Sequence, residues 1–119
     1  MTSHGLGHAT RSLALINAIH VANPSWRFVI SSTISPEWIK NQLQFEVDCR
    51  QQGYEPGAAQ KNCFEVDIVE SLTAYRDFHS RYESILASEV EFLQAHSVSA
   101  VICDIPALPI AAAAQVRIP

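Results

Sequence analysis

HGLGHATRSLAL, residues 4–15, is the stretch that decides the fold. Its two glycines, at positions 5 and 7, let the backbone turn tightly and expose amide N–H groups beside the start of a helix. Apolar residues then recur at helical spacing from Leu13 to Ile19, and the pattern stops before Pro24, where proline cannot continue a helix. The stretch predicts a glycine loop followed by a helix over residues 9–22, with an anion or a polar oxygen favoured at the helix start.

The glycine spacing alone leaves two interpretations open, a structural turn and a ligand-binding loop. It is no Walker A loop, because no Gly-Lys-Ser or Gly-Lys-Thr follows Gly7. It also lacks the third glycine of a dinucleotide-binding fingerprint.

Strand and helix patterns alternate along the rest of the chain. Ser35-Pro36-Glu37 supplies a helix N-cap, a proline in the first turn and an acidic residue there. Residues 51–62 contain two glycines and a proline without periodicity, which predicts a loop. We expect strands over residues 26–31, 45–49 and 98–105, and helices over residues 36–43, 67–93 and 106–114.

Two of these elements carry the most specific patterns. Asp67 followed by Glu70 resembles a capping box, and an apolar stripe continues from Ile68 to Leu93, which predicts one long amphipathic helix. The apolar run over residues 98–105 is typical of a buried parallel strand with a polar residue, Asp104, at its carboxyl end. The alternation as a whole predicts an α/β fold, a Rossmann-like parallel sheet within a single domain over residues 1–119.

Composition excludes several partner classes. The 119 residues are 48% apolar and 17% charged, with a net charge of −4, which fits a soluble globular protein. Without a run of Lys or Arg, nucleic acid is excluded as a partner. The sequence has neither a membrane-spanning stretch nor a signal peptide, which predicts a cytoplasmic protein. The three cysteines form no CxxC pair, so we expect no disulfide framework and no metal site.

The sequence resembles one known family in two blocks. HGLGHATRSLAL is similar to the N-terminal loop and first helix of GT-B-type glycosyltransferases, specifically the bacterial glycosyltransferase-like proteins related to the N-terminal part of plant L-arabinokinases. The second block is VICDIPALP, residues 101–109, with the alanine-rich stretch and Arg117-Ile118-Pro119 after it. It resembles the strand, turn and helix found later in the same domain.

The resemblance implies a partial GT-B N-terminal domain, the acceptor side of the enzyme, that lacks its first strand. Family members carry a glycine before the first histidine of the loop, where this chain has Ser3, and an apolar strand before that. We therefore expect a truncated or misassigned reading frame, or one part of a split gene, with a missing C-terminal domain that binds most of the donor. The implied partners are a nucleotide-sugar donor and a small-molecule acceptor, without a cofactor.

The implied catalytic residues are His8 and Asp104. By resemblance, His8 is the general base on the acceptor hydroxyl, and Asp104 accepts a hydrogen bond from His8 and holds its tautomer. Structural alternatives are a histidine that hydrogen-bonds the helix start and an aspartate that caps the helix after Pro106. The expected substrate-binding residues are His4, Gly5, Gly7, Thr10 and Arg11, although Arg11 could instead pair with a nearby carboxylate.

Two other functions remain open at this stage. One is a non-catalytic sugar- or nucleotide-binding module of an arabinokinase-like protein, and the other is a nonfunctional remnant. Several aromatic residues favour the core over a role as sugar-stacking platforms: Trp26, Trp38, Tyr75, Phe78 and Tyr82. His20, His79 and His96 lie on helical patterns and are interpreted as structural or exposed.

Overall fold

The computed structural model describes Met1 and residues 6–119. This part of the chain is mixed α/β, with five helices and a two-stranded parallel sheet. It divides into two compact units, Met1–Gly53 and Tyr54–Pro119, and each unit is described by itself. The predicted α/β class is confirmed at this level, because parallel strands alternate with helices in the first unit.

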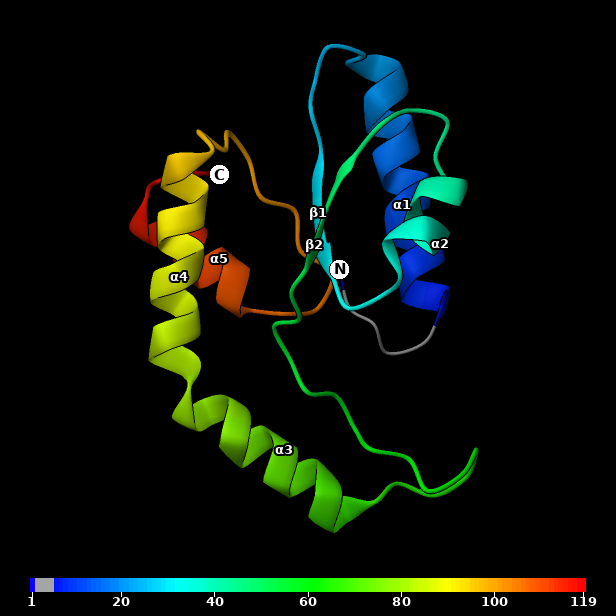
Figure 1. Ribbon diagram of the computed structural model, residues 1–119, viewed down its shortest axis with the longest axis vertical. Coiled ribbons are helices and arrows are strands. Elements are labelled where there is room, and N and C mark those ends of the chain that lie inside the picture. The colour runs from blue at the N-terminus through cyan, green and yellow to red at the C-terminus, as the bar shows by residue number, and fades with distance from the viewer. Residues whose placement is uncertain (2–5) are drawn as a thin grey trace. The chain divides into compact units, whose positions relative to one another are not determined.

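The first unit is built on the parallel pair of β1 (Val29–Ser32) and β2 (Asp48–Gln51). Parallel strands need a crossover connection, which here includes α2 (Pro36–Asn41). Figure 1 shows α2 and the longer α1 (Leu6–Ala22) beside the two strands. The pairing register runs from Val29 opposite Asp48 to Ser32 opposite Gln51.

Apolar side chains from all of these elements form the core of the first unit. α1 contributes Leu13, β1 contributes Ile30 and α2 contributes Ile39, which is 1% exposed. Leu43 and Val47, between α2 and β2, complete the buried set. The predicted start of α2 is confirmed, because the Ser35 hydroxyl accepts a hydrogen bond from the Trp38 N–H at 3.4 Å.

His20 has a structural place in the first unit, as the sequence predicts. Its ring stacks on Phe45 with centroids 3.7 Å apart, and Phe28 meets it edge-on. Among the atoms described, its Nδ1 is buried and has no hydrogen-bond partner.

The second unit is helical, with α3 (Ile68–Ser80), α4 (Tyr82–Ala95) and α5 (Leu108–Gln115). α4 packs against α5, as the ribbon in Figure 1 also shows. The buried core consists of Tyr54, Leu86, Leu93, Leu108, Ala112 and Ala113. α3 contributes no buried residue to it.

The predicted long helix over residues 67–93 is wrong in one respect, because it breaks at Arg81. Its N-terminus is confirmed, since the Asp67 side chain accepts a hydrogen bond from the Glu70 N–H at 2.9 Å. At the break, the Ser80 hydroxyl and the Arg81 Nε both donate to the Asp77 carbonyl, at 2.8 and 3.3 Å. The Arg81 N–H bonds to the Phe78 carbonyl instead. Side-chain donors thus compete with the helical bond that would continue α3.

The predicted strand over residues 98–105 does not form in the described structure. Val98 and Val101 pack instead against the core between α4 and α5. The Val101 N–H donates to the carbonyl of Pro119 at 2.9 Å, and no strand pairs with this segment. Positive φ angles of 51° at Ser97 and 81° at Ile105 bound it, so its backbone cannot continue as an extended strand at either end.

The other strands begin later than predicted. β1 starts at Val29 rather than residue 26, and β2 at Asp48 rather than residue 45. Phe45 and Val47 still pack in the core, so their alternating pattern reports burial rather than strand pairing.

Cysteine reactivity follows from this packing. Burial raises the pKa of Cys49 and Cys103 above the usual value, whereas Cys63 is exposed. A raised pKa lowers the thiolate fraction at any given pH, and the thiolate is the reactive form. We expect iodoacetamide at pH 7.5 to label Cys63 roughly tenfold faster than the other two, as measured by mass spectrometry of tryptic peptides. Equal labelling of all three thiols would contradict this burial.

In the part of the chain that the structure describes, no helix combines the length and the apolar character needed to cross a membrane.

Candidate functional site

The predicted substrate loop is described only in part. His4 and Gly5 lie outside the described residues. Gly7, His8, Thr10 and Arg11 lie on the first turns of α1, which begins at Leu6. The predicted loop is therefore helical from Leu6 on, earlier than the sequence pattern indicates.

Nothing among the described residues requires a glycine at position 7. A Cβ atom built there meets no atom of Met1 or residues 6–119 within 4 Å, and the residue is exposed. Glycine in a helix costs about 0.5–1 kcal/mol relative to alanine. A bare backbone at the start of a helix leaves room for a ligand to approach the amide groups, which is one use of such a glycine.

His8 and Thr10 differ in how they are held. His8 is partly buried in the first turn of α1. The Thr10 hydroxyl donates to the Leu6 carbonyl at 2.8 Å, within the helix. Its proton is therefore committed to the backbone, and Thr10 can meet a substrate only as a hydrogen-bond acceptor. Arg11 is exposed.

Asp104 lies in a strained turn of the second unit. Ile105, which follows it, has φ of 81°. A β-branched residue rarely adopts this left-handed region, and such outliers cost about 1–3 kcal/mol and gather at functional sites. Asp104 is not the N-cap of α5, because Ala107 occupies that position without a side-chain cap.

The strain at Ile105 can be measured. Ile105 is 59% exposed, so an Ile105→Gly variant loses little burial and adopts the positive φ without steric cost. We expect a stability gain of about 1 kcal/mol in urea unfolding, after the larger backbone entropy of glycine in the unfolded chain is included. Ile102 is 63% exposed without a positive φ, so Ile102→Gly is the matched control and should be destabilising. Equal losses in both variants would rule out the strain.

The two predicted catalytic residues belong to different units. His8 lies in Met1–Gly53 and Asp104 in Tyr54–Pro119. Their pairing stays a prediction.

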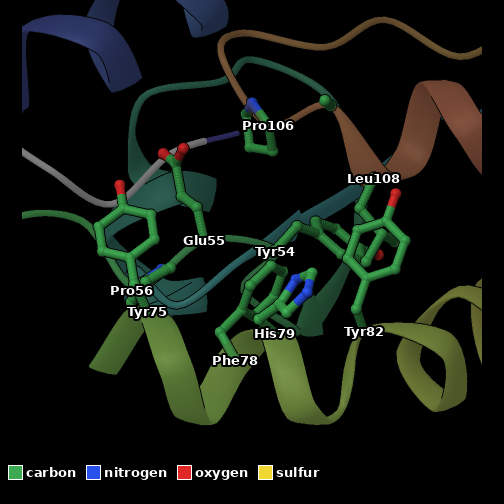
Figure 2. Close-up of a pocket in the computed structure, with 10 residues that line it drawn as sticks. Tyr54, Glu55, Pro56, Tyr75, Phe78, His79, Tyr82, Pro106 and Leu108 are labelled. Atoms are coloured by element: carbon green, nitrogen blue, oxygen red, sulfur yellow. The ribbon is translucent and has the colours of Figure 1, made fainter. Parts of the chain in front are cut away.

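The second unit contains a pocket of about 280 Å³. Its walls come from the loop after residue 53, from one face of α3 with the start of α4, and from the start of α5 (Figure 2). The lining residues are Tyr54, Glu55, Pro56, Tyr75, Phe78, His79, Tyr82, Pro106, Ala107 and Leu108.

Buried contacts fix the base of this pocket. The Tyr54 ring is buried, and its hydroxyl donates to the Glu89 carboxylate at 2.7 Å. Leu108, in the wall from α5, is 2% exposed. Phe78 and Tyr82 meet edge to face with centroids 6.2 Å apart. These contacts support a pocket whose aromatic walls exist before any ligand enters.

The predicted core role is confirmed for Phe78 and Tyr82, which pack against the core of the second unit. The sequence interpretation did not predict that these two rings also line a pocket together with Tyr75. Tyr75 is 49% exposed and lies on the pocket rather than in a core. Trp26 is also exposed rather than buried. One available signal was His79, a polar ring within the apolar stripe at a spacing that places it on the same helix face as Tyr75 and Tyr82.

Within Met1 and residues 6–119, no three His, Cys, Asp or Glu side chains gather as metal ligands. A scan of protein families and searches of curated proteins and of solved structures find no match to this chain.

Proposed function

We propose that this chain is the acceptor-side part of a glycosyltransferase that transfers a sugar from a nucleoside-diphosphate donor to an acceptor hydroxyl. The main support is the HGLGHATRSLAL motif together with the exposed, sterically unconstrained Gly7 beside His8. A ligand that approaches the helix start accounts for a glycine that packing does not require. The strained turn after Asp104 adds independent support, because strain of this kind gathers at functional sites.

In the proposed reaction, the His8 imidazole takes the proton of the acceptor hydroxyl while that oxygen bonds to the anomeric carbon. The bond from the anomeric carbon to the diphosphate oxygen breaks, and the nucleoside diphosphate leaves with its electron pair. Asp104 accepts a hydrogen bond from the second ring nitrogen and stabilises the imidazolium that forms. The Gly7 amide and the Arg11 side chain donate hydrogen bonds to the substrates. A second domain supplies most of the diphosphate site.

The test compares sugar transfer by two proteins. One is the chain as given, and the other is the extended chain, which adds whatever in-frame coding sequence precedes Met1 and follows Pro119. With UDP-, GDP- and dTDP-sugars as donors, we expect transfer by the extended chain and weak donor binding without turnover by the chain alone. Transfer by the chain alone would contradict the need for a second domain. Donor binding without transfer in both proteins would instead favour a non-catalytic binding module.

A further inference from the structure

Four ring side chains gather on one side of α3 and the start of α4. Tyr75, Phe78, His79 and Tyr82 are spaced by three, four and seven residues, so they lie on one side of α3 and of the first turn of α4. All four line the pocket of the second unit, and Figure 2 shows their rings rising from the helices into it. Phe78 and Tyr82 also pack against the core of the second unit. Tyr75 is 49% exposed and α3 has no fully buried residue, so core packing does not account for the Tyr75 ring.

The pocket lining contains an acidic side chain and no Lys or Arg. Glu55 is the only carboxylate among the ten lining residues, and none of the ten is Lys or Arg. Figure 2 shows the Glu55 side chain beside Pro56 and the Tyr75 ring, with its carboxylate pointing away from the rings of Phe78 and His79. Aromatic faces carry negative partial charge, and they attract cations within about 6 Å of the ring centre. A carboxylate adds to this field and repels phosphate and carboxylate ligands.

The size of the pocket also favours a small cation. A volume of about 280 Å³ lies just below the range of about 300–1,000 Å³ typical of small-molecule sites. A compact cation fits such a space, whereas a nucleotide sugar carries a diphosphate that the lining does not neutralise.

From these observations, we propose that the pocket lined by Tyr75, Phe78, Tyr82 and Glu55 binds a small organic cation of the alkylammonium class. The rings surround the apolar substituents of the ammonium group, and Glu55 provides the counter-charge. The site lies within the second unit and does not involve His8, so it is separate from the proposed sugar transfer.

The experiment titrates the chain with choline and with 3,3-dimethylbutan-1-ol, a neutral molecule of nearly the same shape. Binding is followed by the NMR shifts of the tyrosine ring protons at constant ionic strength and pH 8, above the range in which histidine usually carries a proton. We expect choline to bind at least about tenfold more tightly, because only choline gains the cation–π and carboxylate attraction. Equal binding of the two probes would overturn the proposal.

Four variants separate the contributions. We expect Glu55→Gln and Tyr75→Leu each to weaken choline binding about threefold to tenfold, in the range of an exposed cation–π contact or ion pair. Tyr75→Phe keeps the ring face and should bind choline like the wild type. Glu91→Gln removes an exposed carboxylate of α4 that does not line the pocket, and it is the matched charge control.

Two further outcomes count against the proposal. If methyl α-glucoside binds in the pocket and choline does not, the pocket is a neutral sugar site. If Glu55→Gln and Glu91→Gln weaken choline binding equally, the attraction comes from the net charge of the protein and not from the pocket. Neither result bears on sugar transfer by the extended chain, so the two proposals fail independently.

Discussion

Replacing His8 by glutamine in the extended chain is expected to lower the rate of sugar transfer by about 10²–10⁴-fold. Glutamine keeps a polar side chain of similar length but cannot take a proton from the acceptor hydroxyl. His8 lies in the first turn of α1 and is only partly buried, so the substitution leaves the core of the first unit intact. Steady-state kinetics with a saturating donor measure the effect.

The distribution of this loss between kcat and KM distinguishes catalysis from binding. A general base acts in the transition state, so kcat should fall while the KM for the acceptor changes little. A residue that only contacts substrate would raise KM at nearly constant kcat. His96→Gln, at the exposed C-cap of α4, is the control and should retain full activity. Unchanged kcat in His8→Gln would exclude this residue as the base.

Truncating Ile39 to alanine should destabilise the first unit by about 2–5 kcal/mol. Ile39 is 1% exposed and is among the largest fully buried side chains described. The loss combines the transfer free energy of the removed carbon atoms with the cavity they leave. Because domains of this size are stable by only about 5–15 kcal/mol, the variant should unfold at markedly lower urea concentration, as measured by circular dichroism.

A graded series tests the assignment of the core. Ile39→Val removes one methylene group and should cost about 0.5–1.5 kcal/mol. Val21, on α1, is 80% exposed, so Val21→Ala is the surface control and should change stability by less than about 0.5 kcal/mol. If Val21→Ala destabilises the chain as much as Ile39→Ala, the packing described for α1 and α2 is wrong.

The starts of α2 and α3 were predictable because their signals are local. Ser35 caps α2 and Asp67 caps α3, each through a hydrogen bond to an N–H three residues later. The apolar periodicity likewise predicted α1, which begins three residues earlier than expected. Such features need no knowledge of distant parts of the chain.

The errors arise where the local structure is determined by contacts with distant residues or by competing hydrogen bonds. The apolar run over residues 98–105 fits a strand, but Val98 and Val101 are partly buried by packing against the helical core of the second unit instead. The stripe from Ile68 to Leu93 gives no warning of the break at Arg81, where Ser80 and Arg81 take the carbonyl of Asp77. Periodicity reports which side chains are apolar, not which partner buries them.

The candidate site was predictable in part. The motif predicted Gly7 and His8 in a loop just before a helix, whereas the structure places both residues within the first turn of α1. Strain at Ile105 and the aromatic pocket could not be predicted, because a positive φ and a cavity depend on tertiary packing that no local pattern specifies.

A double-mutant cycle on His8 and Asp104 in the extended chain tests the proposed mechanism most directly. The cycle measures kcat/KM for wild type, His8→Gln, Asp104→Asn and the double variant. If the carboxylate acts through the imidazole, the double variant should be little worse than His8→Gln alone, with a coupling energy of about 1–3 kcal/mol. Fully additive losses would mean that the two side chains act independently, and the proposed pair would be wrong.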